Sequence, residues 1–277
     1  MSTSARTRAF WNAHPCDGQE AADALRDYRH AKEPWLPSLL AHIAASENDI
    51  LEVGCGQGAD GLFICRRMSA GGRYVGLDQS DASIRNARRF AADAVPPPSV
   101  SPVYNAGDAL ALPFEPNSIG AVYSMGVLHH LDETEQAIGE IFRVLRPGGK
   151  FYLGLYNSWA WKVAVAHALR GFQEILDTLT GRDRMVYSWL LNSPYAATTG
   201  TMIHECFGVP VLKSYSATGM RQLLKQFQIE SLSSFGSRSS PDGSWDSRGE
   251  SSTTKSLGYL WVAIARKPAN DAHTSPN

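Results

Sequence analysis

The sequence has almost no excess charge and few cysteines. Its 277 residues carry 26 Lys and Arg against 27 Asp and Glu, a formal net charge of −1. Proteins that bind nucleic acid usually carry a basic face, so this balance argues against a nucleic-acid partner. The four cysteines form no CxxC pair and no metal-ligand spacing. We therefore predict reduced thiols, no bound metal and a cytoplasmic location.

Signals for secretion and membrane insertion are also missing. Residues 1–15 lack the apolar run that a signal peptide needs. The longest apolar stretch, 151–169, approaches the ~20 residues of a membrane span. Asn157, Lys162 and His167 interrupt it. We predict a buried strand followed by a buried helix in this stretch, with no stable membrane insertion.

The composition that remains is globular, with 43% hydrophobic and 19% charged residues. From residue 50 onward, amphipathic stretches alternate with short apolar runs at 50–53, 73–77, 100–104, 119–125 and 150–156. Such alternation predicts a doubly wound α/β domain, in which helices cover both faces of a parallel sheet.

The same patterns divide the chain into five segments. We expect an N-terminal helical cap (1–49), a cofactor-binding α/β core (50–157) and a helical lid insertion (158–208). A C-terminal part of the core (209–267) and a disordered tail (268–277) follow. The C-terminal part contributes two further strands, at 228–235 and 257–266.

A glycine-rich turn, Glu52-Val-Gly-Cys-Gly-Gln-Gly58, follows the first strand and precedes a helix. Glycines let the backbone approach a ligand closely, and a helix N-terminus offers free N–H groups. The turn also fits a relaxed dinucleotide-binding pattern. A strand-to-helix turn without any ligand is the other interpretation.

Asp78 ends the second strand, 24 residues after Gly54. A carboxylate at this place can accept hydrogen bonds from both hydroxyls of a ribose. This predicts a ligand that contains adenosine without choosing among such ligands. Alternatively, Asp78 caps the next helix, although Ser80 and Asp81 can do so equally well.

Three further segments decide between these ligands. They are NAGDALALPF at 105–114, IGAVYSMGVLHHL at 119–131 and RVLRPGGK at 143–150. In this order they resemble the class I S-adenosylmethionine-dependent methyltransferases that act on small molecules. The resemblance covers residues 50–156 closely, and beyond residue 157 only the general layout is shared.

The resemblance implies a seven-stranded Rossmann-like sheet with an antiparallel last strand, and S-adenosylmethionine as the cofactor. It also implies roles for individual residues. Gly54 and Gly56 lie against the methionine part and the ribose, Asp78 binds the ribose hydroxyls with Gln79 beside it, and Asp108 and Ala109 meet the adenine. Ser124 offers its backbone carbonyl to the cofactor's ammonium, while Glu52 and Cys55 belong to the glycine loop. Tyr28 and Arg29 are candidates for the cofactor's carboxylate.

His129 and His130 follow the fourth strand, where enzymes of this family hold the sulfonium and the acceptor. A histidine there can serve as a general base, because its ordinary pKa lies near 6.5. Alternatively, both residues orient the loop or cap the helix at 133–145. Methyl transfer chiefly needs in-line alignment, which proximity supplies without a base.

The absence of certain motifs narrows the range of possible methyl acceptors. No Asn/Asp-Pro-Pro-Tyr/Phe follows the fourth strand, and no magnesium-binding carboxylates stand there. Residues 156–215 hold nine of the chain's 27 aromatic residues, which fits a roof over an apolar acceptor, a homodimer interface or plain packing. We expect methyl transfer to a small organic molecule of specialised metabolism. The alternatives are non-methyl chemistry with the same cofactor, by alkylation or cyclisation, and a non-catalytic cofactor-binding subunit.

Overall fold

The computed structural model describes residues 3–15, 21–191, 204–236 and 258–269. Within them, seven strands form one sheet in the order β3-β2-β1-β4-β5-β7-β6. Only β7 runs antiparallel to its neighbours, β5 and β6, so the predicted topology is confirmed. The strands are β1 (Asp49–Val53), β2 (Arg73–Asp78), β3 (Val103–Ala106), β4 (Ile119–Met125), β5 (Leu145–Tyr156), β6 (Gln228–Phe235) and β7 (Leu260–Arg266).

The third strand lies later in the sequence than predicted. We expected residues 100–104, but pairing with β2 begins at Val103, opposite Val75. Pro102 explains the shift, because a proline has no N–H to donate to a sheet ladder. The fifth strand differs in the other direction: β5 begins at Leu145 and includes the Pro147-Gly148 segment, with irregular pairing to β4.

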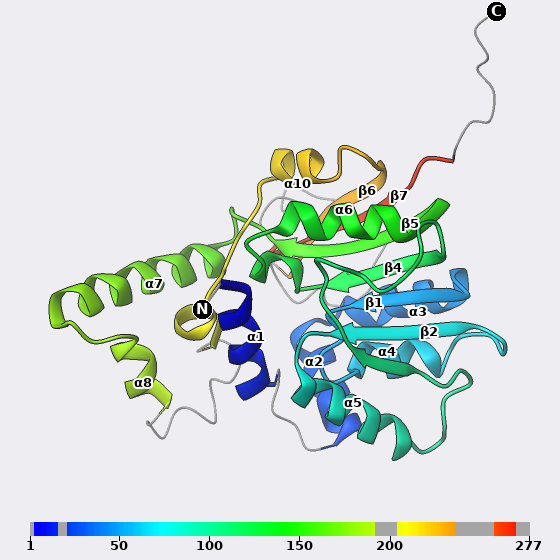
Figure 1. The fold of residues 1–277 in the computed structure, drawn as a ribbon, viewed down its shortest axis with the longest axis horizontal. Coiled ribbons are helices and arrows are strands. Elements are labelled where there is room, and N and C mark those ends of the chain that lie inside the picture. Colours follow the sequence, from blue (N-terminus) through cyan, green and yellow to red (C-terminus); the bar gives the residue numbers. More distant parts are fainter. Residues whose placement is uncertain (1–2, 16–20, 192–203, 237–257, 270–277) are drawn as a thin grey trace, which may run out of the picture.

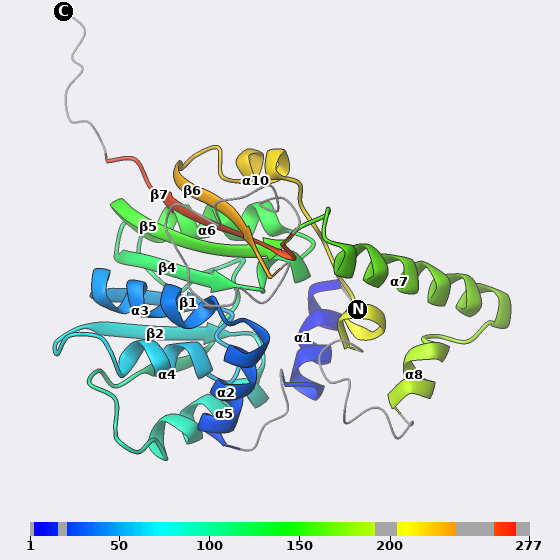
Figure 2. The same cartoon turned by 180° about the vertical axis from the view of Figure 1, so that it is seen from behind.

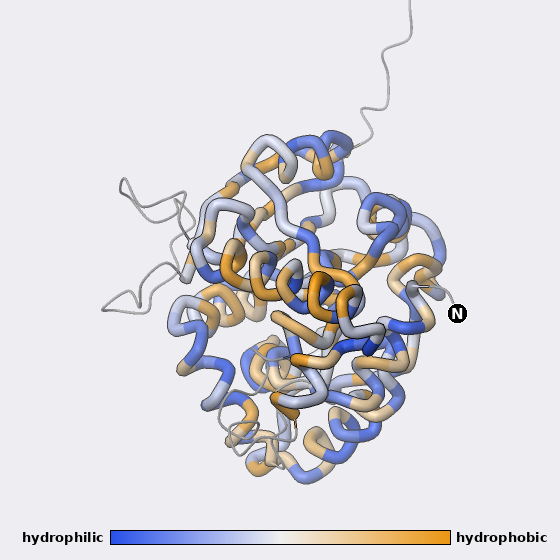
Figure 3. Tube along the Cα trace, turned by 90° about the vertical axis from the view of Figure 1, so that its left-hand side faces the viewer, coloured by the Kyte–Doolittle hydropathy of each residue, from blue (hydrophilic) through white to orange (hydrophobic). Residues whose placement is uncertain are grey.

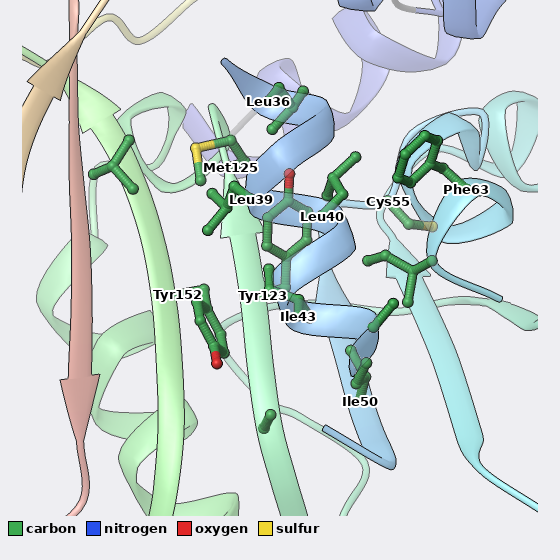
Figure 4. Packing of buried hydrophobic residues seen from close by; sticks show 14 of the residues in the cluster. Leu36, Leu39, Leu40, Ile43, Ile50, Cys55, Phe63, Tyr123, Met125 and Tyr152 are labelled. Carbon is green, nitrogen blue, oxygen red and sulfur yellow. The ribbon is translucent and has the colours of Figure 1, made fainter. Parts of the chain in front are cut away.

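Helices cover both faces of the sheet (Figures 1 and 2). Three of them, α3 (Leu36–Ser46), α4 (Ala59–Cys65) and α5 (Asp81–Ala92), pack on one face, and α6 (Thr134–Val144) and α10 (Ala217–Leu223) pack on the other. Figure 4 shows Leu39, Leu40 and Ile43 of α3 directed toward Tyr123 and Tyr152 of the sheet. The two cores hold the strands in place and leave the carboxyl edge of the sheet for a ligand.

The N-terminal segment is helical as expected and lies across that carboxyl edge. It contains α1 (Thr3–Ala13) and α2 (Ala22–Lys32), followed by α3. The guanidinium of Arg29 on α2 forms two hydrogen bonds to Asp60 of α4, at 2.6 and 2.7 Å. A planar guanidinium matches a carboxylate in this bidentate geometry, so α2 is fastened to the core.

The insertion between β5 and β6 projects from one end of the sheet (Figure 1). It contains α7 (Trp161–Thr180), α8 (Met185–Leu191) and a short π-helix, η2 (His204–Gly208). The prediction of a buried helix was wrong for α7. Val163, Ala166 and Gln173 are buried, but Trp161 and Phe172 are 66% and 53% exposed, because no described element packs against that side.

Membrane insertion can be checked only for the described helices. Among these, no helix has both the length and the apolar content to cross a membrane. Residues 192–203 of the predicted lid insertion and most of the predicted tail lie outside the described residues.

Candidate cofactor and acceptor site

One cavity runs along the carboxyl edge of the sheet, and its wall contains residues from distant parts of the chain. The strand order places them in a row: Asp108 follows β3, Asp78 ends β2, the glycine loop follows β1, Met125 ends β4, and Tyr156 ends β5. A binding cleft at the carboxyl ends of parallel strands is expected for a doubly wound sheet.

The glycine loop approaches the cavity with positive φ angles at Gly54, Gly56 and Gly58, at 81°, 49° and 82°. A Cβ atom on Gly54 would lie 2.3 Å from a methyl carbon of Val127. A Cβ atom on Gly56 would meet nothing within 4 Å, because it would point into open space. Gly54 is therefore required by packing, while Gly56 leaves room for a ligand against the backbone.

Asp78 faces the cavity beside the glycine loop. One carboxylate oxygen accepts a hydrogen bond from the N–H of Gly56 at 2.9 Å, and the other accepts from the N–H of Ser80 at 2.8 Å. Burial raises the pKa of Asp78, and these two N–H bonds oppose the change. The helix α5 is capped by Ser80, whose hydroxyl accepts from the N–H of Ser83. Asp78 therefore does not cap α5.

Asp108 lines the far end of the same cavity, with Gln79 and Ala109 nearby in the wall. Its carboxylate accepts a hydrogen bond from the N–H of Leu110 at 2.9 Å. The guanidinium of Arg8, on α1, lies 3.6 Å from it, and the Asp108 side chain is 38% exposed. The carboxylate is thus oriented by the backbone while one side stays accessible.

A buried acidic network lies beneath the glycine loop. Glu52 accepts a hydrogen bond from the Tyr74 hydroxyl, and burial together with the Asp60 charge raises the pKa of Glu52 to about 8. Asp60 accepts from Arg29 and, at 2.7 Å, from the Tyr123 hydroxyl. Glu52 therefore holds its proton at neutral pH, whereas Asp60 is paired with a cation.

Three residues that we singled out, Ser124, Tyr28 and His129, lie outside the cavity wall. Ser124 is fully buried, and its hydroxyl donates to the Val53 carbonyl at 2.9 Å, which ties β4 to β1. Its neighbours Met125 and Gly126 face the cavity instead. Tyr28 does not line the cavity either: the Lys32 ammonium lies 4.9 Å from its ring centroid. Cys55, by contrast, is buried in the wall as a free thiol, which donates a hydrogen bond to the Gly56 carbonyl.

His129 and His130 form a short hydrogen-bonded chain at the end of β4. The His130 Nδ1 lies 2.9 Å from the Val211 carbonyl, which can only accept, so Nδ1 carries the hydrogen. The neutral Nε2 of His130 then accepts from the Nε2–H of His129 at 3.1 Å. The remaining nitrogen, Nδ1 of His129, is buried without a partner. The ring of His129 stacks on Tyr156 with centroids 3.8 Å apart.

Burial disfavours a charge on either histidine. It lowers the pKa of His130 to about 4 and that of His129 well below its usual value, with His130 adding to the effect on His129. Only His130 lines the cavity. Neither ring caps α6, because the Thr134 hydroxyl donates to the Leu128 and Leu131 carbonyls there. Both histidines are neutral and held in fixed orientations.

Comparison with known proteins identifies the core of this arrangement. Residues 51–153 match the family described as methyltransferase domain. Residues 51–153 form a methyltransferase domain, and the similarity to S-adenosylmethionine-dependent enzymes lies in this part of the chain. The matched residues include the glycine loop, Asp78, Asp108 and His130, which line the cavity, and His129, which does not.

Individual relatives agree with this assignment. The chain is 31% identical over 152 residues to a probable S-adenosylmethionine-dependent methyltransferase of Mycolicibacterium smegmatis, covering 54% of each protein. It is 36% identical over 108 residues to the sterol 24-C-methyltransferase of Clavispora lusitaniae, covering 39% of this chain and 27% of that one. The chain therefore matches about half or less of the length of these curated relatives.

A solved structure supports the fold along nearly the whole chain. The magnesium protoporphyrin IX methyltransferase of Synechocystis superposes with a TM-score of 0.55 and 15% identity. The superposition covers 95% of this chain and 94% of that one. At this identity the likeness concerns the fold alone.

The cavity of the methyltransferase domain fits the family's cationic cofactor. The cavity wall contains five acidic residues, Glu33, Glu52, Asp60, Asp78 and Asp108, of which Glu52 is protonated at neutral pH, against the two basic residues Arg29 and Lys32. Asp78 and Asp108 would hold the ribose and adenine ends, and the open space at Gly56 admits the ligand to the backbone. When bound, the cofactor supplies an electrophilic methyl group.

Several lining residues had no signal in the sequence. Trp11, Glu33 and Tyr259 come from α1, the end of α2 and the residue before β7. Glu33 accepts a hydrogen bond from the Trp35 indole at 2.5 Å and another from the Tyr259 hydroxyl. Burial raises the pKa of Glu33 despite these bonds. Only the fold brings these three residues together.

Proposed function

We propose that this protein transfers the methyl group of S-adenosylmethionine to a small organic acceptor, in specialised metabolism. The observation that carries the proposal is the order of the lining residues along the sheet edge. Groups suited to adenine, ribose and methionine follow one another from β3 to β4. A cofactor lying along this row leaves the end over β5 and β7 for a second molecule.

The end of the cavity over β5 and β7 has the chemistry of an acceptor pocket. It is lined by Tyr156, Tyr259 and Leu260, with Glu33 as its carboxyl group and Trp11 nearby. Aromatic walls bind an apolar acceptor, and one buried carboxyl group fixes its orientation through a hydrogen bond. An acceptor with an aromatic or polycyclic body and one hydroxyl or amine suits this lining. The sterol and porphyrin named for two similar proteins are molecules of this size class.

The two histidines act by orientation in this proposal. The one ring nitrogen of His130 that can accept a proton, Nε2, already accepts the hydrogen bond from His129. A pKa of about 4 also makes His130 a weak base at neutral pH. Its ring lies 5.3 Å from that of Trp11, so both rings shape the same wall. Alignment of the acceptor with the methyl group then provides the main acceleration, since proximity alone can contribute about 7–11 kcal/mol.

The insertion acts on the cavity indirectly. No described residue of 158–208 lines the cavity, but Phe10 of α1 packs against Tyr187 of α8, with ring centroids 6.4 Å apart. The next residue, Trp11, is in the cavity wall. We propose that the insertion serves as a lid by positioning α1, and that its protection from hydrogen exchange rises when the acceptor binds.

The test of this function combines binding with product analysis. Calorimetry should show that S-adenosylmethionine and S-adenosylhomocysteine bind and that NAD does not. Incubation with methyl-labelled cofactor and candidate aromatic acceptors should then yield labelled product and S-adenosylhomocysteine. Binding without label transfer, but with release of the aminobutyrate arm or a cyclised product, would favour the non-methyl alternative. Binding without any product would favour a non-catalytic subunit.

The role of the histidines has its own test. The variant His130→Ala should keep turnover within about tenfold at saturating cofactor, because a positioned base would contribute about 10²–10⁴-fold. The rate should not rise with pH through a histidine pKa between pH 5.5 and 9. A large loss in this variant, or in His129→Ala, together with such a rise, would assign that residue as the base.

A further inference from the structure

The outward side of α7 carries a continuous apolar row. Among the nine large hydrophobic residues that the structure shows as exposed, seven lie between residues 159 and 189. Five of these seven are on α7, namely Trp161, Val165, Phe172, Ile175 and Leu179, with exposed fractions of 66%, 46%, 53%, 60% and 77%. Hydrophobic segments recur along the coils at this end of the molecule (Figure 3). Such a row on a surface marks an interaction site.

The spacing of this row is that of a helix-packing seam. With the exposed Ala168 included, the row reads 161, 165, 168, 172, 175 and 179, which alternates steps of four and three residues. This is the heptad period by which two helices pack side by side. The row extends about 27 Å along the helix at 1.5 Å per residue.

The row is also symmetric about residue 170. If a second α7 runs antiparallel with its midpoint at the same place, Trp161 lies beside Leu179, Val165 beside Ile175, and Ala168 beside Phe172. Large side chains then face smaller ones, and the same pairs occur twice. A twofold interface requires this self-complementarity: if residue i of one copy contacts residue j of the other, then residue j of the first copy contacts residue i of the second.

The neighbouring positions favour a helix over a lipid surface. Ala164 and Gly171 flank the row and let a second backbone approach closely. Of the charged residues on this part of α7, Lys162 lies over the Tyr259 ring, and Glu174 is exposed. A surface helix that binds lipid usually carries several basic residues beside its apolar face. Glu174 lies on the opposite side of α7 from the row, and Lys162 is the only basic residue of this helix near the row.

We propose that α7 pairs with α7 of a second copy of this chain, in an antiparallel dimer centred on residue 170. The exposed parts of the row amount to roughly 600 Å² per copy, or roughly 1,200 Å² for the pair, which reaches the lower end of specific interfaces. The dimer is independent of the methyl-transfer proposal, because the row does not contribute to the cavity.

The first test measures the oligomeric state of the full chain. Sedimentation or light scattering at about 50 µM should show a dimer, as expected for an interface of micromolar affinity or better. Phe172→Glu should shift it to monomer, because Phe172 lies next to the symmetry axis and two charges would enter the seam. The matched control, Val103→Glu, changes a residue of similar exposure (51%) on the edge strand β3 and should leave the dimer intact. Circular dichroism and cofactor affinity should be unchanged in both.

The second test determines the direction of pairing. A mixture of Val165→Cys and Ile175→Cys chains, one of them tagged, should form a mixed disulfide dimer in higher yield than either chain alone. Preferential pairing of identical variants would overturn the antiparallel arrangement. A monomeric wild-type chain, or a dimer that persists in Phe172→Glu, would overturn the proposal. Binding of a monomeric chain to phosphatidylcholine vesicles would also overturn it and assign the row to lipid.

Discussion

The core and the insertion of this chain use apolar residues in opposite ways. In the core, Leu36, Leu39, Leu40 and Ile43 of α3 are completely buried, each by the sheet and by neighbouring helices. In the insertion, α7 is equally rich in apolar residues, yet one side of it has no partner within the described structure. Apolar content therefore identifies the helix in both cases, but only the topology determines which of its faces is covered.

The difference can be tested most directly with two leucines. Leu39→Ala in the core should lower the free energy of unfolding by about 2–5 kcal/mol, because it leaves a cavity in a packed cluster. Leu179→Ala in the insertion, at a side chain that is 77% exposed, should change it by at most about 0.5 kcal/mol. Urea unfolding at low protein concentration, where the chain is monomeric, measures both. Similar losses would mean that the α7 face is covered in solution.

Acid should destabilise the core through its buried histidines. The pKa of His130 is about 4 in the folded protein and near 6.5 in the unfolded chain, so the unfolded chain takes up the proton first as the pH falls. The stabilisation is complete above pH 6.5 and is lost as the pH falls from 6.5 to 4. This difference between the folded and unfolded pKa of His130 corresponds to about 3 kcal/mol in the free energy of unfolding.

The control for the acid effect is a less buried histidine. His130→Gln should flatten the loss of stability between pH 6.5 and 4, measured by urea unfolding at each pH. His42→Gln, at a partly exposed side chain of α3 whose pKa is lowered by burial and by Lys150, should flatten it less. Equal slopes in the wild type and His130→Gln would show that His130 does not titrate differently on folding.

Cofactor binding should depend on the core alone. Asp78→Ala should weaken S-adenosylmethionine binding by about 1.5–3 kcal/mol, the range for hydrogen bonds that involve a charged group. Asp81→Ala, three residues later and exposed in the first turn of α5, is the matched control and should leave the affinity unchanged. An unchanged dissociation constant for Asp78→Ala, measured by calorimetry, would remove this carboxylate from the cofactor site.

Two glycine-to-alanine substitutions, which should have the smallest effects on stability, test whether the insertion unfolds together with the core. Gly139 on α6 and Gly171 on α7 are both helical, and a Cβ atom on either would meet nothing within 4 Å. Gly139→Ala should stabilise the protein by about 0.5–1 kcal/mol, because alanine favours the helix. Gly171→Ala should instead raise hydrogen-exchange protection within α7 only, since α7 packs mainly on other parts of the insertion. Equal global stabilisation would show one cooperative unit.

Much of the fold and part of the site could be predicted because their signals are local. The strands, the glycine loop and Asp78 each depend on a few consecutive residues. The alternation of strands and helices predicted the doubly wound sheet, while the antiparallel last strand was implied by the family resemblance. Glu33, Trp11 and Tyr259 could not be predicted, because they lie up to 248 residues apart in the sequence (259 − 11) and meet only in the folded chain. The pairing of the histidine rings with Val211 is likewise set by a distant segment.

The bidentate pair of Arg29 and Asp60 has a consequence for shortened versions of this protein. A chain beginning at Asp49 would still contain the whole region that matches the methyltransferase domain family. It would, however, expose the sheet face that α3 covers, and it would leave Asp60 buried beside Tyr123 without its cation. An unpaired buried carboxylate is costly, so such a truncation should fail to fold or should aggregate. We therefore expect the minimal folding unit of this protein to include its N-terminal helices as well as the matched residues 51–153.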